Sequence, residues 1–265
     1  MRRRLSLLLL KLQYLPPCTE EKIFNLLMPL FFLILMALAT ACSIICDKKT
    51  FLAVFAYVKD LESQWAQKMF IFFKLNFLFF AYPAFPCLIA IVYCTICVRC
   101  SYAIRNLTHK ISLCSPEQFG PSEQIHALRY KAKIDEILQI TQEIFSVPSF
   151  CLIVANSISC YSTLGWYLMS HLNAFQLIEV LSIGMSSLLC MTCIRWTAGT
   201  LPGELNKLKD TFYAKAYLRW ISFRFPSEKN FRREVLDKPE FVFTGCDIFH
   251  YRRSFIFAVV ETLIN

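Results

Sequence analysis

Four long stretches without charged residues constrain this chain more than any other feature. They are residues 23–45, 75–98, 144–169 and 174–194, and only Glu179 interrupts the last of them. Each is close to or above the ~20 residues that a helix needs to cross the bilayer core. The chain is 56% hydrophobic with a mean hydropathy of +0.47, and a soluble domain does not need apolar runs this long. We therefore predict an all-α, multi-pass transmembrane helical bundle.

The distribution of Lys and Arg predicts how these spans are oriented. The segments before the first span, between the second and third, and after the fourth carry 5, 6 and 12 of them. The other two connections carry 4 and none, and Lys74 stands at a helix edge. Basic loops stay in the cytoplasm. We therefore expect the N-terminus to lie inside, with residues 1–22 as a cytoplasmic leader.

The net charge of +9 follows from the same bias. Basic inner segments are attracted to the anionic lipid of the inner leaflet, so the lipid bilayer is the expected partner. A basic chain also suggests nucleic acid, but no nucleic-acid-binding module is visible. We expect no nucleic-acid partner.

Both long inner segments contain a run with the periodicity of an amphipathic helix. We expect these runs to extend the spans into the cytoplasm as helices that pack on one another, with attachment to the lipid surface as the alternative. The prolines within the spans predict kinks rather than helix ends. The first apolar face is Ile134, Ile137, Leu138, Thr141 and Phe145, the second is Leu205, Leu208, Phe212, Ala216 and Trp220, and the prolines include Pro83, Pro86 and Pro148.

Thirteen cysteines suggest a metal site until they are placed on the spans. Cys94, Cys97 and Cys100 have the spacing of zinc or iron–sulfur ligands. Here they continue a hydrophobic helix, in which Cys behaves as a small apolar residue. We predict neither a metal nor a cofactor. Because no zinc-protease, phosphate-loop or nucleophile-elbow motif is present, we also expect no enzyme activity.

Polar residues inside the predicted membrane region suggest a ligand site. Glu179 lies near the outer start of the fourth span, and an intramembrane acid by default marks a water-filled cavity or a functional site. Asn156, Ser159, Thr163 and Tyr167 share one face of the third span, together with a cysteine. We hypothesise that these five residues line an outward-opening pocket for a small polar or amphipathic ligand. A carboxylate that reaches the outer interface and hydrogen bonds between helices are the alternatives.

The C-terminal stretch 243–265 carries a family resemblance. Small residues and a Phe, followed by basic residues, lead into an apolar helix that starts at Ser254 and is too short to cross a bilayer. This pattern resembles the entry to the seventh helix of arthropod gustatory receptors. The matching residues are Gly245, Phe249, Arg252 and Arg253.

The final Thr-Tyr-x5-Gln-Phe motif of that family is incomplete here, because Leu263 follows Thr262 and the Gln-Phe pair is absent. We expect the chain to be the product of a truncated reading frame, and a short helix that lies at the membrane interface is the alternative. Its order of spans resembles the third to sixth family helices and part of the seventh.

The resemblance implies a seven-helix chemoreceptor in the plasma membrane with a cytoplasmic N-terminus. It implies a homo- or hetero-tetrameric, ligand-gated cation channel that detects small-molecule tastants. Its final helix would line the pore, here with Ser254, Phe257 and Glu261, and an acid there attracts cations. The alternatives are a non-conducting subunit that regulates a full-length receptor, and a transporter fragment, for which the expected internal repeat is not visible.

Overall fold

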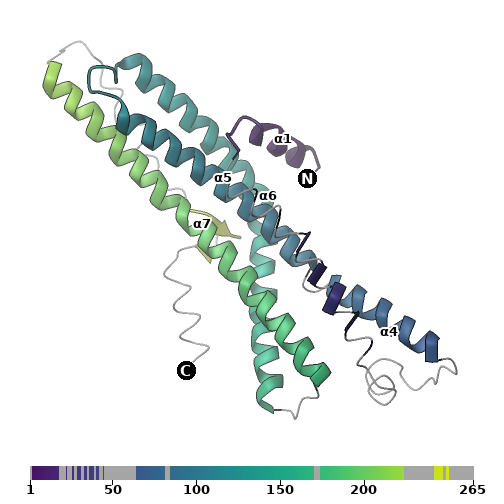
Figure 1. Ribbon diagram of the computed structural model, residues 1–265. Coiled ribbons are helices and arrows are strands. Elements are labelled where there is room, and N and C mark those ends of the chain that lie inside the picture. Colours follow the sequence, from purple (N-terminus) through teal and green to yellow (C-terminus); the bar gives the residue numbers. More distant parts are fainter. Residues whose placement is uncertain are drawn as a thin grey trace. The chain divides into compact units, whose positions relative to one another are not determined.

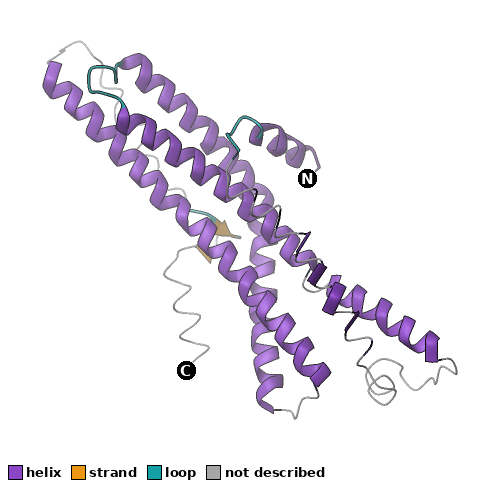
Figure 2. Ribbon diagram, viewed as in Figure 1, coloured by secondary structure: helices purple, strands orange, loops and turns teal. Residues whose placement is uncertain are grey.

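The structure, a computed structural model, is all-α apart from one short hairpin in the part of the chain that it describes (Figures 1 and 2). It describes residues 2–17, 64–80, 84–169, 174–223, 242–246 and 249–250, with scattered positions between 22 and 44. The helices are α1 (Arg2–Leu12), α4 (Gln64–Phe79), α5 (Phe85–Leu113), α6 (Pro121–Met169) and α7 (Ala174–Phe223). The strands β1 (Thr244–Gly245) and β2 (Phe249–His250) pair in antiparallel orientation.

Three of the described helices are long and apolar enough to cross a membrane, which suggests a membrane protein. The apolar segments lie within Phe85–Leu113, Pro121–Leu168 and Gln176–Ser222. Helices α6 and α7 have 49 and 50 residues. At 1.5 Å per residue each is about 75 Å long, more than twice the thickness of a bilayer core. Both helices therefore continue well past their apolar parts, as the predicted extensions of the spans require.

The predicted second span, 75–98, covers the end of α4 and the first half of α5. Pro86 is the second residue of α5, and Ala84 just before α5 has a π-helical conformation, a local irregularity of the kind that accompanies helix kinks. Pro148 instead lies inside α6, which continues through it as predicted. Most of the predicted span 23–45 lies outside the described residues, and all of the predicted span 254–265 does.

The chain divides into two compact units, and α5, α6 and α7 contribute to both. Unit 1 comprises Met1–Glu21, Tyr93–Phe150 and Cys193–Asn265. Unit 2 comprises Lys22–Val92 and Cys151–Thr192.

The core of unit 1 confirms the first predicted apolar face. All five of its residues are buried, and Ile134, Leu138 and Thr141 are fully so. Thr141 donates its hydroxyl hydrogen to the carbonyl of Ile137 in the preceding turn, at 2.8 Å, so its only polar side-chain atom is satisfied. The amphipathic pattern therefore identified the packed side of α6.

The second predicted apolar face is only half right. Leu208 and Phe212 are buried, but Trp220 is 55% exposed. Beyond Phe212, α7 faces several backbone carbonyls at the end of α5 and in the loop that follows it. These carbonyls accept hydrogen bonds from Lys and Arg side chains rather than packing against the indole ring of Trp220. Lys215 donates to the carbonyl of Cys114 at 2.8 Å. Arg219 donates to the carbonyls of Pro116 and Glu117 at 3.2 and 2.6 Å.

The predicted leader contains α1, which packs on the remainder of unit 1 (Figure 1). Leu8, Leu12 and Leu15 are buried. Arg4 and Lys11 form ion pairs with Glu143 and Glu136 of α6, the first at 3.0 Å. Arg99 of α5 donates to the carbonyl of Leu15 at 3.0 Å. Of these partners, Arg99 and Glu143 lie next to residues 98 and 144, where predicted spans end and begin, and Glu136 lies about two helical turns before residue 144.

Candidate functional site

The polar face predicted on α6 packs against α7 within unit 2. Asn156 is buried, and its amide nitrogen donates to the carbonyl of Leu152 at 2.8 Å and to the sulfur of Cys190 at 3.5 Å. Ser157 also reaches α7, because its hydroxyl donates to the sulfur of Met191 at 3.2 Å. Asn156 of this face and the neighbouring Ser157 therefore join the two helices through weak hydrogen bonds to sulfur.

A glycine on α7 lets the two helices approach each other about two turns further along. A methyl group added at Gly184 would stand 3.1 Å from the hydroxyl oxygen of Thr163. That hydroxyl donates to the carbonyl of Cys160 at 3.0 Å. The thiol of Cys160 points to the carbonyl of Gly184 at 3.9 Å. This is the close packing of small residues that joins helices in membranes.

The other predicted ligand residues take different places. Ser159 is half-buried on α6, and Tyr167 is 55% exposed. Glu179 lies within α7, but its side chain falls outside the described part of the structure. The structure thus brings Asn156 and Thr163 against α7, as the interhelical alternative expects, and the ligand pocket stays a prediction. Ser254, Phe257 and Glu261, the predicted pore residues, also lie outside the described residues.

The cysteines with metal-ligand spacing are packed as apolar residues. Cys94, Cys97 and Cys100 are almost completely buried along α5. The sulfur of Cys94 accepts a hydrogen bond from the hydroxyl of Thr197 on α7, at 3.3 Å. Among the residues that the structure describes, no three His, Cys, Asp or Glu side chains come together as a metal site.

A hydrogen-bonded contact between α6 and the β1–β2 hairpin was not predicted from the sequence. The side-chain nitrogen of Gln142 donates to the backbone and side-chain oxygens of Thr244 at 2.7 and 2.6 Å. The amide of Thr244 donates back to the side-chain oxygen of Gln142 at 3.2 Å. Ser146 donates to the carbonyl of Thr244 at 3.2 Å and accepts from the amide of Cys246 at 3.0 Å. We call this contact the hairpin latch.

An aromatic cluster lies next to the hairpin latch. Phe243 is buried and meets Tyr93 of α5 edge to face, with ring centroids 5.6 Å apart. Tyr93 also packs against Phe145 of α6 at 5.5 Å. Cys246 adopts a left-handed backbone conformation with φ of 51°, which is uncommon for a residue other than glycine and here turns the chain after β1. The segment that leads to the predicted final helix is therefore held on α5 and α6 together.

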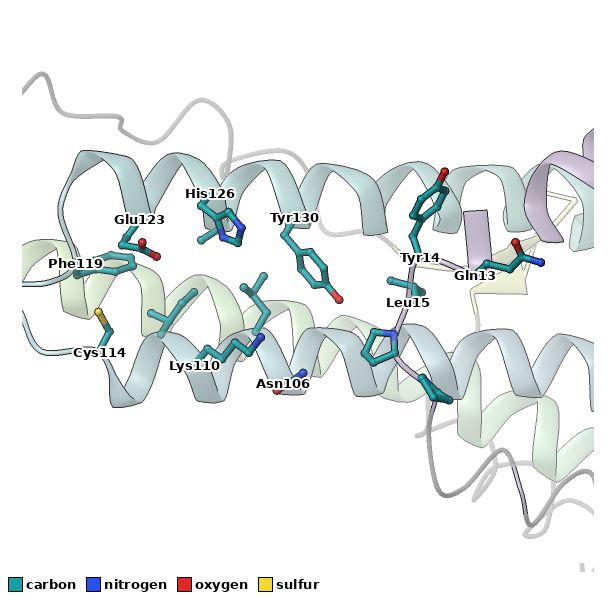
Figure 3. A pocket seen from close by; sticks show the side chains of 15 residues that line it. Gln13, Tyr14, Leu15, Asn106, Lys110, Cys114, Phe119, Glu123, His126 and Tyr130 are labelled. Carbon is teal, nitrogen blue, oxygen red and sulfur yellow. The ribbon is translucent and has the colours of Figure 1, made fainter. Parts of the chain in front are cut away.

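Unit 1 also contains a cavity of about 600 Å³ that the sequence did not reveal (Figure 3). The end of α5, the start of α6 and residues 13–17 after α1 line it. Its polar residues include Asn106, Lys110, His126 and Tyr130. The only sequence signal was that the segment around residues 114–122 is polar, which does not indicate a cavity.

No protein-family model matches the chain, and no curated protein is significantly similar to it. Its function is therefore inferred from its own residues and fold.

Proposed function

We propose that this chain is a gustatory-receptor-like subunit of a chemosensory, ligand-gated cation channel in the plasma membrane. One observation carries the proposal. Two helices, α6 and α7, run from apolar segments into a packed extension, and the hairpin before the predicted final helix is latched onto one of them. A subunit that senses a ligand at one level and gates a pore at another needs such a connection.

Helix α6 connects the two predicted parts of the mechanism. The predicted ligand residues begin at Asn156, and the hairpin latch uses Gln142 and Ser146. Asn156 and Ser146 lie ten residues, or about 15 Å, apart along one continuous helix. A ligand that prefers one position of α6 shifts the closed–open equilibrium. The hairpin latch then carries this shift to the segment that begins at Ser254.

Recording ligand-evoked currents tests this proposal. Cells that express the chain, alone and with a full-length gustatory receptor, are exposed to a panel of small-molecule tastants. We expect a cation current whose ligand sensitivity changes with Glu179→Gln. We also expect Gln142→Ala to change the fraction of open channels. Gln139→Ala, on an exposed neighbouring position of α6, is the matched control.

Other outcomes would assign the chain differently. Co-assembly with a full-length receptor without a current of its own supports the non-conducting, regulatory subunit. Uptake of a labelled solute without a channel-like current supports the transporter fragment. Currents that are the same in the presence and absence of the chain, without co-assembly, contradict all of these receptor roles.

A further inference from the structure

The cavity of unit 1 has a buried apolar floor and an open polar rim. Leu107 and Ile111 of α5, Phe119 of the following loop and Ala127 of α6 all line it and are all buried. At about 600 Å³ it falls within the range of sites that hold small organic molecules. The floor therefore offers an apolar surface to one part of a ligand.

The rim presents hydrogen-bond donors from two helices. Figure 3 shows Asn106 and Lys110 on α5, across from His126 and Tyr130 on α6. An ammonium group, an amide nitrogen, an imidazole and a phenol can all donate hydrogen bonds. Among the described residues, the side chains of Asn106, Lys110 and His126 have no hydrogen-bond or ion-pair partner. This set of donors suits a negatively charged group.

Glu123 is the one acidic residue among those that line the cavity. It lies in the first turn of α6, where a carboxylate interacts favourably with the positive end of the helix dipole. Figure 3 shows it at the end of the cavity near Phe119, away from Asn106. The start of α6 thus favours its charge, and of the donors His126 lies next to it along α6, whereas Asn106 and Tyr130 lie further toward the other end of the cavity.

The distance of the charged and polar donors from the predicted spans favours a soluble ligand over a membrane lipid. Lys110 is twelve residues beyond the end of the predicted span at residue 98, or about 18 Å along α5. Tyr130 and His126 precede the span that begins at residue 144 by about 21 and 27 Å along α6. The headgroup layer is only about 6 Å thick on each side. Lys110, His126 and Tyr130 therefore lie beyond the headgroup layer, whereas residues 13–17 bring the opposite end of the cavity close to the predicted boundary, where Leu15 accepts a hydrogen bond from Arg99.

We propose that the cavity binds a small cytosolic organic anion, a carboxylate or phosphate that carries an apolar group. Lys110 and Asn106 hold the charged group, with His126 and Tyr130 facing it. The apolar group lies on Leu107, Ile111 and Phe119. The placement in the cytosol depends on the predicted orientation of the chain, whereas binding itself does not. A bound anion joins α5, α6 and the segment after α1, which makes the cavity a regulatory site.

Binding of phenyl phosphate to the purified chain in phosphatidylcholine nanodiscs tests the proposal. We expect saturable binding, with phenol and inorganic phosphate each at least about tenfold weaker because each lacks one half of the ligand. Lys110→Met should weaken phenyl phosphate about tenfold, and Lys110→Arg should retain it. Lys133→Met removes an exposed lysine of α6 that does not line the cavity, and it should have no effect.

Three results would overturn the proposal. The first is equal binding by the native chain and Lys110→Met. The second is equal affinity for phenol, which would make the cavity an apolar site only. The third is displacement of phenyl phosphate when the nanodiscs contain phosphatidylserine, which would make the site a lipid site. Since the assay measures no current, its failure is separate from a failure of the channel proposal.

Discussion

The two units share helices α5, α6 and α7, but exposed apolar side chains have a different meaning in each. In unit 1 α6 buries one side, with Ile134 and Leu138 fully covered. In unit 2 the same helix leaves Ile158 and Leu168 61% and 71% exposed. Water does not tolerate such a surface over a long segment, whereas lipid does. The comparison indicates that the surroundings change along the length of one helix.

The polar contacts also differ between the units, because charged side chains take part in unit 1 and not in the contacts between α6 and α7 in unit 2. Unit 1 uses charged donors, such as Arg99 to the carbonyl of Leu15 and Lys215 to the carbonyl of Cys114. The contacts between α6 and α7 in unit 2 are uncharged, and Asn156 and Ser157 donate to sulfur. A charged side chain is costly inside a bilayer, so small neutral contacts between α6 and α7 are what the predicted third and fourth spans require.

Removing a core side chain from unit 1 should have the largest effect. Leu138 is fully buried, and Leu138→Ala should lower the free energy of unfolding by about 2–5 kcal/mol. Leu113 of α5 is 73% exposed, and Leu113→Ala should change it by less than about 0.5 kcal/mol. Denaturant unfolding in detergent measures both. Equal effects would mean that unit 1 has no packed core at Leu138.

A lysine on the exposed side of unit 2 should test directly whether this side faces lipid. Ile158 lies near the middle of the predicted third span, and Ile158→Lys should oppose membrane insertion by about 2.5–3.5 kcal/mol. Leu113→Lys, at a similarly exposed position of unit 1, should insert normally. A glycosylation-based insertion assay in microsomes gives the inserted fraction. If both variants insert equally, the exposed side of unit 2 does not face lipid.

The close approach of α6 and α7 in unit 2 should be sensitive to a single methyl group. Gly184→Ala places a carbon 3.1 Å from the hydroxyl of Thr163 and should cost about 1–3 kcal/mol. Adding Thr163→Ala should recover part of this loss. Gly165→Ala on α6 has nothing within 4 Å and is the control, with no loss expected. Thermal unfolding in detergent compares the variants, and a loss that Thr163→Ala leaves unchanged would rule out this contact as its cause.

The hydrogen bond between the helices should have the smallest effect on stability. Asn156→Ala should cost only about 0.6 kcal/mol, because interhelical hydrogen bonds in membranes are weak on average. Ser162→Ala, at an exposed position of the same helix, should cost less. Unfolding and ligand response are measured in parallel. A normal ligand response in Asn156→Ala would remove this residue from the predicted pocket.

The helical periodicity of the sequence was enough to find the packed face around Leu138, but it failed around Trp220. Periodicity reports which side of a helix is apolar, and α6 places that side against other helices. The partner of α7 near Trp220 is a loop with exposed carbonyls, and cations at Lys215 and Arg219 satisfy them. The sequence of a helix does not show which surface the helix will pack against.

The sequence by itself determined the all-α class, the third and fourth long apolar segments and the side of α6 that packs. These properties depend on the length and period of local runs, which each helix carries alone. Only the tertiary structure decided that α1 packs on α6, that Gln142 holds Thr244 and that Lys110 and His126 line one cavity. These pairs are far apart in the chain or join separate helices, and their contacts depend on packing in three dimensions rather than on any local pattern.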